Sequence, residues 1–439
     1  MSVRRRRLKA YDRRLLAGQP VSEEQRTDYP VGWYFARYGE DLKPGDVVPL
    51  ELMSRQWALF RTRSGKVGLI DSLCCHAGAD LARSGWATDD RLACGYHAWE
   101  FETDGRCTAI PRVPDDKIPA RARQRSLPVI ERAGNIYFWY GPEPVREFID
   151  LDYFCSDGFE NVKGQIYIGR GDPERISEHI VDSYHFPYSH KIKVPVEYVV
   201  LANEGNTFEF QLKPLEAADT RLQAISSHAF GEMAAPCIGV YRTQTDTTVD
   251  RKRPLLTVLT AATPIREGLF TFSWRIAVRK IGPDRYFRPL NKAFGRFMFV
   301  LVRWNYYSDM EVLKWMRNPP AKPLLVKPDG PAIRGYRAFY RRHIIPGWRW
   351  GDPAPEGWTG SNGTSASTAR PGVSTTGETG TVPPAAAPAT TAPATTAPAT
   401  TAPAPAATTS PAPAGVAVPR PAAGYDDATP VPDLVNGRP

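Results

Sequence analysis

Two short Cys/His pairs constrain this chain more than any other feature of its sequence. One residue separates Cys74 from His76, two separate Cys94 from His97, and 17 residues lie between the pairs. Four of the six cysteines fall between Cys74 and Cys107, so the thiols are concentrated rather than scattered. Each pair places one thiolate and one imidazole on a tight loop. Two such loops facing each other offer two sulfur and two nitrogen ligands to a metal centre.

The order of ligands within the pairs separates two kinds of metal centre. Structural zinc sites use the same residue types, but usually from Cys-x₂₋₄-Cys and His-x₃₋₅-His elements. A Rieske [2Fe–2S] cluster takes two cysteines on one iron and two histidines on the other. One Cys and one His from each loop suit that cluster, which the sequence therefore favours. A zinc-stabilised binding protein, which would be colourless, is the alternative.

The surroundings of the pairs indicate loops carried by a small β domain. Residues 57–60 and 67–70 predict one hairpin, and residues 99–101 and 106–108 predict another. Residues 94–111, with Cys-Gly-Tyr-His-Ala-Trp-Glu-Phe followed by Asp-Gly-x-Cys and Ile-Pro, resemble the second cluster loop of Rieske oxygenases nearly throughout. The resemblance implies that the cluster ligands are Cys74, His76, Cys94 and His97.

A second constellation follows further along the chain. Asp172 and Pro173 predict the start of a helix that ends before Pro187. The helical spacing puts Asp182 and His185 on one face, together with Glu178. His179 lies off that face and is left out of the predicted site.

With His190, these residues form Asp-x₂-His-x₄-His. Two imidazoles spaced in this way can take adjacent positions on one metal, and with a carboxylate they make the two-His, one-carboxylate set of oxygen-activating iron. A lone Asp-x₂-His would more simply be a surface ion pair. Here, residues 178–190 resemble the mononuclear-iron helix of the same family, which implies that His185 and His190 bind iron.

The carboxylate ligand has to come from a distant part of the chain. Asp309, 119 residues after His190, opens a predicted helical run that stops before Pro319, and Glu311 is a nearby competitor. Residues 309–331 resemble the end of the catalytic domain in the ketosteroid 9α-hydroxylase and cholesterol 7-desaturase branch. There the Asp that matches Asp309 is the carboxylate ligand.

The resemblance spans roughly residues 28–350 and implies an α+β protein. It predicts an all-β Rieske [2Fe–2S] domain at 28–145 and a catalytic mononuclear iron domain at 146–360, with an antiparallel sheet of the helix-grip, START-like kind. Residues 1–27 remain as a basic N-terminal extension. The resemblance also implies a ring-shaped homotrimer in which Asp182 bridges His97 of one chain to His185 of its neighbour.

The implied function is that of a terminal oxygenase component. Fe(II) activates O₂ when electrons arrive through the Rieske cluster. The sequence has no Gly-x-Gly-x-x-Gly turn and no second cysteine set, so a separate reductase, through a ferredoxin, would oxidise NAD(P)H. By analogy, the substrate is bulky and apolar, such as a steroid or terpenoid that is hydroxylated or desaturated. The alternative is an oxygenase or demethylase of a small aromatic acid or specialised natural product. The second constellation disfavours a purely electron-transferring Rieske protein.

The charge balance excludes little about partners. The net charge is +9, and its densest basic stretch, residues 4–7, is more simply a solvated terminus than a nucleic-acid site. No apolar stretch follows it that would serve as a secretory signal. The best apolar run, residues 297–302, is far shorter than the roughly 20 residues of a membrane span. We therefore expect a cytoplasmic protein with no nucleic-acid partner, no transmembrane segment and thiols free to hold metal.

Residues 361–439 have a composition unlike the rest of the chain. They contain one aromatic residue, Tyr425, and a proline at every fifth position from Pro388 to Pro403, among alanines and threonines. Such a segment cannot bury apolar surface, and we expect it to be a disordered tail.

A chain truncated after Gly360 should keep both metal centres and its turnover, because every predicted ligand lies between Cys74 and Asp309. Iron content and product formation, compared between the truncated and full-length chains, measure this. Loss of iron or of activity on truncation would show that the tail contributes to a site.

Overall fold

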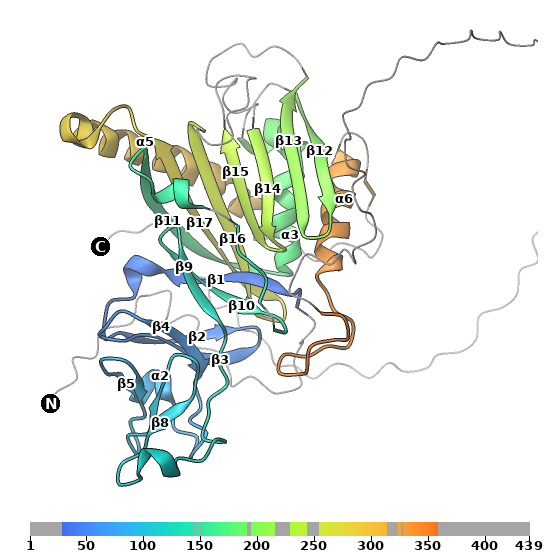
Figure 1. Ribbon diagram of the computed structural model, residues 1–439. Helices are drawn as coiled ribbons and strands as arrows, with labels where there is room; N and C mark the ends of the chain where they lie inside the picture. The colour runs from blue at the N-terminus through green and yellow to red at the C-terminus, as the bar shows by residue number, and fades with distance from the viewer. Residues whose placement is uncertain are drawn as a thin grey trace, which may run out of the picture. The chain divides into compact units, whose positions relative to one another are not determined.

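The computed structural model describes the chain between residues 29 and 358 (Figure 1). Within these limits it leaves out residues 144, 150, 191–194, 216–228, 244–253, 314–323 and 326–328. The predicted basic extension and the predicted tail lie outside the described residues. Among the described helices, none is long and apolar enough to cross a membrane.

The N-terminal half is a small all-β domain with three antiparallel sheets in its described part. Its strands are β1 (Gly32–Tyr38), β2 (Val47–Leu52), β3 (Arg55–Arg61), β4 (Val67–Asp71), β5 (Trp86–Ala87), β6 (Leu92–Ala93), β7 (Glu100–Phe101), β8 (Cys107–Ala109), β9 (Val129–Arg132) and β10 (Asn135–Tyr140). Its short helices are η1 (Gly39–Asp41), α2 (Leu81–Ser84) and η2 (Asp115–Lys117). The sheets are ordered β1-β10-β9, β2-β3-β4 and β5-β6-β7-β8.

Both predicted hairpins are confirmed, as β3–β4 and β7–β8. The second turns at Gly105, which has a φ of +84°. A Cβ at this position would lie 2.2 Å from the carbonyl oxygen of Gln124. The turn therefore needs glycine for both its backbone conformation and its close approach.

The C-terminal half is built on one antiparallel sheet, which has seven strands in the part of the chain described. The strands are β11 (Phe159–Arg170), β12 (Val196–Glu204), β13 (Thr207–Pro214), β14 (Ala229–Ala235), β15 (Ile238–Thr243), β16 (Leu256–Arg266) and β17 (Leu269–Arg279). The helices are η3 (Asp152–Cys155), α3 (Pro173–Glu178), η4 (His179–Val181), η5 (Phe186–His190), α5 (Asp284–Leu313) and α6 (Asp329–Arg342). Strands β12 to β17 form a meander in which each pairs with the next, and β11 is added beside β17.

Two long helices pack at opposite ends of this sheet (Figure 1). Helix α5 contacts β11 and β17, whereas α6 contacts β12 and β13. On α6, Tyr336, Phe339 and Tyr340 are buried at the spacing of one helical face, so this helix packs on the core. The predicted α+β class, an all-β domain followed by an antiparallel sheet with helices, is confirmed.

Strand β17 is buried on both faces. Phe272 and Trp274 share one face, where both pack against Tyr306 of α5. These aromatic residues form core rather than the wall of an open cavity. The polar face, which carries Thr271 and Arg275, is also buried, because it meets the N-terminal domain.

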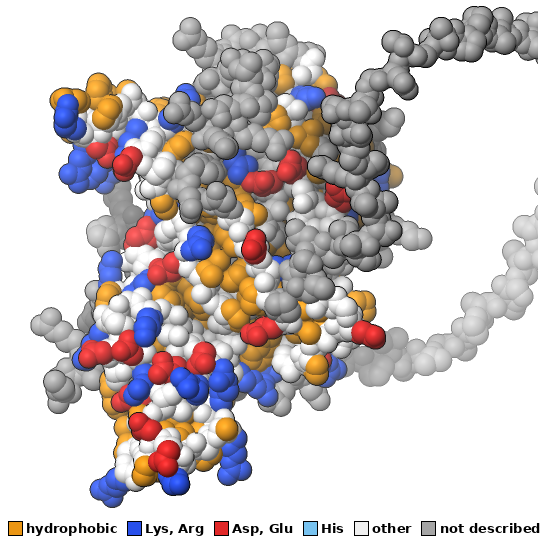
Figure 2. All heavy atoms as spheres, in the orientation of Figure 1, with side chains coloured by type: hydrophobic (Ala, Val, Ile, Leu, Met, Phe, Trp, Pro, Cys, Tyr) orange, Lys and Arg blue, Asp and Glu red, His pale blue; other side chains and the backbone are white. Residues whose placement is uncertain are grey.

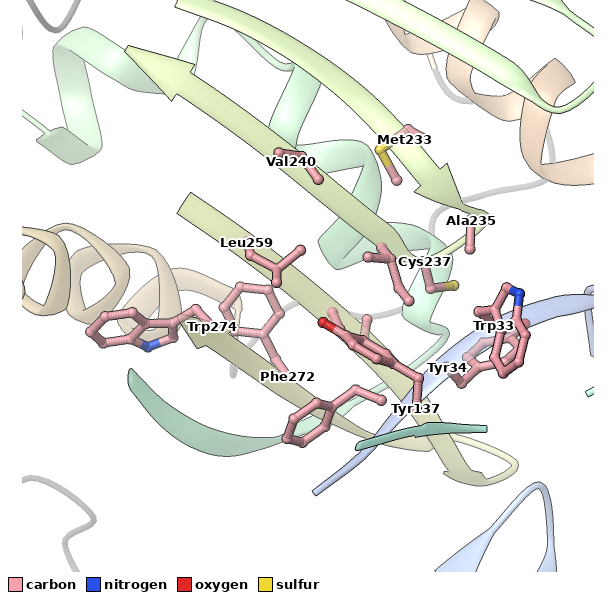
Figure 3. Close-up of a cluster of buried hydrophobic side chains, with 14 of the residues drawn as sticks. Trp33, Tyr34, Tyr137, Met233, Ala235, Cys237, Val240, Leu259, Phe272 and Trp274 are labelled. Atoms are coloured by element: carbon pink, nitrogen blue, oxygen red, sulfur yellow. The ribbon is translucent and has the colours of Figure 1, made fainter. Parts of the chain in front are cut away.

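One apolar core continues from the N-terminal domain into the large sheet. Trp33 and Tyr34 of β1 and Tyr137 of β10 lie in the same cluster as Cys237 and Phe272 (Figure 3). The Thr263 hydroxyl of β16 also donates a hydrogen bond to the Phe35 carbonyl oxygen, at 2.8 Å. Apolar burial and directed hydrogen bonds therefore both join the two halves.

Arg275 is the polar centre of this junction and is 1% exposed. Its guanidinium donates to the amide oxygens of Asn135 (2.8 Å) and Asn161 (2.7 Å), to the Gly134 carbonyl oxygen (2.9 Å) and to the Glu40 carboxylate (2.6 Å). Burial opposes ionisation of Glu40, but hydrogen bonds from Arg275 and its charge outweigh this effect and lower the pKa of the carboxyl. One side chain thus connects η1, β10, β11 and β17.

Replacing this arginine, Arg275→Met, should lower the free energy of unfolding by about 2–4 kcal/mol, somewhat less than for a fully buried pair because Glu40 is half exposed. Denaturant unfolding of the two proteins measures the difference. The matched control is Arg63→Met, at an exposed arginine 4.0 Å from Asp89, where the change should stay within about 0.5 kcal/mol. Equal effects of the two substitutions would contradict the role given to Arg275.

The same pair predicts a pH dependence. Since the pKa of Glu40 is lowered in the folded state, its ionised carboxylate stabilises the fold at pH values above the ordinary pKa of 4.5. This stabilisation is lost as the pH falls through the pKa of the folded state. The difference in the free energy of unfolding between wild type and Arg275→Met should therefore become smaller at acidic pH.

Candidate metal centres

The two predicted cluster loops have the same backbone turn. The Cys74 N–H donates to the Ala79 carbonyl oxygen (2.9 Å), and the Cys74 carbonyl accepts from Gly78 N–H (2.8 Å). In the second loop Cys94 bonds in the same two ways to residues 99 and 98, at 2.8 and 3.0 Å. The fifth position of each turn has positive φ, +71° at Gly78 and +54° at Ala98. The two loops are therefore structural copies, although their sequences differ.

These turns bury the sulfur ligands and expose the nitrogen ligands. Cys74 and Cys94 are 4% and 2% exposed, whereas His76 and His97 lie at the surface with their rings 4.6 Å apart. Burial, with a smaller contribution from the neighbouring Cys94, raises the pKa of the Cys74 thiol to about 11. A buried thiol that resists ionisation suits a centre that supplies positive charge. The structure brings the four predicted cluster ligands together in an arrangement that fits a Rieske cluster.

The first loop is held by a residue that the sequence pattern did not indicate. The buried Gln124 accepts from Cys75 N–H at 2.8 Å, and its amide donates to the carbonyl oxygens of Asp71 and Leu73. In the second loop, Gly95 packs against the backbone of Ser84. A Cβ at position 95 would lie 2.2 Å from the Ser84 carbonyl oxygen, so this contact requires glycine. No motif marks Gln124; only its contacts show its role.

The second constellation starts as predicted but does not continue as one helix. Asp172 caps α3, accepting from Glu174 N–H at 2.9 Å, with Pro173 in the first turn. The α-helix then ends at Glu178 and becomes 3₁₀ over His179–Val181. The predicted continuous helical face is therefore wrong.

The remainder of the constellation is also irregular. Asp182 is extended, with φ −92° and ψ 114°, and His190 closes a π-helical turn that contains Pro187. Glu178 instead pairs with Arg175 (2.6 Å) and with Arg337 of α6 (2.9 Å). It joins α3 to α6 and does not accompany Asp182.

Four donor atoms nevertheless converge on one point. His185 Nε2 lies 3.0 Å from His190 Nε2, and His190 Nε2 lies 3.2 Å from Asp309 Oδ1. His179 Nε2 lies 3.2 Å from the same carboxylate oxygen. The four ligand atoms all lie within 4.8 Å of one another. The structure thus brings together the three predicted ligands and adds His179, which the predicted helical face had excluded.

Asp309 reaches this group from a longer helix than predicted. It does not open a helix but lies near the C-terminal end of α5, which begins at Asp284. Pro289 lies inside α5, one turn after its start, and cannot donate the helical hydrogen bond to residue 285. Asp309 is 3% exposed, and Tyr306, one turn earlier on α5, is half-buried. Glu311, the alternative ligand, does not belong to the converging group.

Hydrogen bonds set the histidine tautomers. The Ser308 hydroxyl donates to the Asn305 carbonyl oxygen at 2.7 Å, so it accepts from Nδ1–H of His190 at 3.1 Å. That leaves the Nε2 lone pair of His190 directed at the group. Burial lowers the pKa of His190 to about 4, so the ring is neutral at neutral pH. His185 has its Nδ1 3.8 Å from Asp182, and this buried nitrogen makes no hydrogen bond within the described residues.

The donor set fits a metal ion. Nε2 of His185 lies 3.0 Å from Nε2 of His190, close enough for both lone pairs to bind one cation. Among the described residues, His179 Nε2 and Asp309 Oδ1 are buried without any hydrogen-bond partner. Buried polar atoms normally have partners, so these indicate a ligand that the protein itself does not supply. Imidazoles with a carboxylate are the donors of oxygen-activating iron.

Comparison with known proteins identifies the family. Residues 32–128 match the Rieske [2Fe-2S] domain family, and residues 143–343 match the 3-ketosteroid 9alpha-hydroxylase C-terminal domain family. The chain belongs to the Rieske oxygenases. Membership implies a Rieske cluster and a mononuclear iron as cofactors, and the two donor sets fit both. The cofactors expected from the sequence are thus confirmed, whereas the assignment of Cys74, His76, Cys94 and His97 as the cluster ligands stays a prediction.

Relatives of this Rieske oxygenase include steroid-modifying enzymes. Cholesterol 7-desaturase nvd 1 of Ciona intestinalis is 35% identical over 149 residues, which are 33% of this chain and 31% of that protein. The chain thus spans about a third of the length of this relative. The oxygenase component of 3-ketosteroid-9-alpha-monooxygenase from Rhodococcus rhodochrous is 23% identical over 72% of this chain and 84% of its own. Apo dicamba monooxygenase has the same fold, with a TM-score of 0.57 at 18% identity over 72% of this chain and 98% of its own.

Substitution of a cluster ligand, Cys94→Ser, should remove the cluster and leave the mononuclear site occupied, so that iron falls from about three atoms per chain to about one. Iron quantitation and the visible spectrum measure this. Cys75→Ser is the matched control, because Cys75 is exposed and contributes its backbone N–H to the loop. If Cys94→Ser kept the spectrum, or if Cys75→Ser lost it, the ligand assignment would be wrong.

Proposed function

We propose that the chain is a terminal oxygenase that hydroxylates or desaturates a bulky apolar substrate, such as a steroid or terpenoid. The observation that carries this proposal is the presence of two separate donor sets in one chain, Cys₂His₂ at the surface and a buried His/Asp group. When bound, the mononuclear iron would activate O₂ and the cluster would deliver electrons.

The chain's own side chains keep the second site ordered. Ser308 holds the ring of His190, and Asp182 faces Nδ1 of His185. Asp182 also accepts from Tyr184 N–H at 3.0 Å, which fixes its carboxylate. Burial raises the pKa of Asp182, but its interaction with His185 outweighs this effect and lowers it. The Asp182 carboxylate thus faces the Nδ1 side of His185, 3.8 Å away.

Aromatic residues around this site support an apolar substrate. Phe186 lies 5.4 Å from the His190 ring and next to Tyr198. Burial, followed by the charge of Asp309, raises the pKa of Tyr306, so its phenol stays neutral beside the carboxylate. The names of the relatives, cholesterol 7-desaturase and 3-ketosteroid-9-alpha-monooxygenase, support a steroid-like substrate for this chain.

The electron donor in this proposal is a separate ferredoxin with an NAD(P)H-dependent reductase. Exposed arginines lie beside both cluster loops. Arg83 directly precedes Ser84, which packs against Gly95 of the second loop, and Arg123 lies beside Cys75 of the first loop. Figure 2 shows basic side chains, interspersed with acidic ones, over the N-terminal domain. With a net charge of +9, such a surface favours association with an acidic redox protein.

A homotrimer completes the proposed route of electrons. His97 is exposed and the Asp182 side chain is 32% exposed, so both are accessible to a neighbouring chain. In the proposed assembly, Asp182 connects a neighbour's His97 to His185.

A substrate panel tests this function. Steroids, terpenoids and aromatic acids are incubated with the full chain, NADPH and a surrogate ferredoxin and reductase. We expect a steroid or terpenoid product that has gained one oxygen or lost two hydrogens. Turnover of aromatic acids alone would contradict the proposal.

The bridging role of Asp182 is tested by Asp182→Asn, which keeps the acceptor for Tyr184 N–H but removes the charge. We expect multiple-turnover rates to fall about 10- to 100-fold, the range typical for partners of metal-binding histidines, while the iron stays bound. The control is the exposed Asp157→Asn, which should retain the wild-type rate. An unchanged rate in Asp182→Asn, with full iron content, would overturn the role.

A further inference from the structure

We propose that His179 is a fourth protein ligand of the mononuclear iron, which would then be held by three histidines and one carboxylate. This inference rests on the proposed function, because it assumes that the buried His/Asp group binds metal. It departs from the two-His, one-carboxylate set that the sequence pattern predicts.

The distances agree with one shared ion. For metal–donor bonds of about 2.1 Å, neighbouring donors of an octahedral ion lie about 3.0 Å apart and opposite donors about 4.2 Å apart. The three close pairs of donor atoms measure 3.0, 3.2 and 3.2 Å. The whole set lies within 4.8 Å, so only a small contraction is needed to place all four donors on one ion.

A hydrogen bond between His179 and Asp309 does not explain the contact. His179 Nε2 and Asp309 Oδ1 are 3.2 Å apart, but neither atom makes a hydrogen bond within the described residues. The side chain of His179 is 19% exposed and that of Asp309 is 4% exposed, so water has little access to either. Two buried atoms that both lack a partner and both face the same point are satisfied together by a cation.

The local backbone explains how His179 reaches the site. In a continuous α-helix its side chain would point about 120° away from that of His185, six residues later. The α-helix instead ends at Glu178, and a 3₁₀ turn with a different period follows over His179–Val181. The His179 ring then stacks on His185, with centroids 3.8 Å apart and planes inclined by 30°. Stacking fixes the ring with its Nε2 towards Asp309.

A fourth donor changes what the site can bind. Three protein donors leave about three open positions on a six-coordinate ion, whereas four leave about two. His179 would thus restrict the number of oxygen- or water-derived ligands that the iron can hold at once.

Zinc offers a direct test, since the cluster contains none. The full chain, with its cluster intact, is loaded with Zn(II) at the mononuclear site, and zinc-edge X-ray absorption counts the imidazoles. We expect three imidazoles in wild type and two in His179→Asn. Zinc affinity should fall at least about 10-fold, since loss of partners outside the ligand sphere already costs that much. His179→Gln is a second variant, and the visible spectrum of the cluster reports folding of each protein.

Matched variants separate the outcomes. His190→Asn should also leave two imidazoles, whereas His343→Gln, at a buried histidine that bonds to the Phe339 carbonyl oxygen, should leave three. Two imidazoles in both wild type and His179→Asn would overturn the fourth-ligand assignment, whether or not affinity changes. Failure of the wild-type chain to bind zinc or iron at this site would instead overturn the proposed function.

Discussion

The catalytic half of the molecule is organised around one group of converging donor atoms. Nε2 of His185 and Nε2 of His190 face each other at 3.0 Å, while Ser308 holds the Nδ1 proton of His190 and the Asp182 carboxylate lies 3.8 Å from Nδ1 of His185. Asp309 adds a buried negative charge to the same point. Without a metal, these groups would be expensive to bury together. The irregular backbone of 179–190, with its 3₁₀ and π-helical turns, positions these donors.

In each domain, the surrounding elements hold the residues of one candidate metal site in place. In the N-terminal domain, two copies of one turn bury the thiols, and Gln124 ties the first copy to its neighbours. In the C-terminal domain, α5 carries Asp309 and Ser308 and is packed on β11 and β17. Arg275 then joins strand β17 to the N-terminal domain. The two candidate metal sites therefore lie in domains that share one continuous core.

Local patterns could be predicted from the sequence, and contacts between distant elements could not. The cluster ligands stand out because the Cys and His of each pair lie within four residues of each other. Hairpin turns are marked by glycine. Asp309 was found only through resemblance, since nothing in its spacing links it to a histidine 119 residues earlier. His179 was excluded because the pattern assumes a constant 3.6-residue period, whereas the chain changes to a 3₁₀ turn at that residue. The partners of Arg275 come from elements that no local pattern connects.

Mössbauer spectroscopy of the reduced, ⁵⁷Fe-labelled full-length chain tests the central claim most directly, because it separates iron by its ligands. The account predicts signals of a Rieske cluster and a distinct high-spin ferrous site with nitrogen and oxygen ligands, in a ratio of about two irons to one. Cluster signals alone, in a chain that still binds its substrate and folds normally, would contradict it.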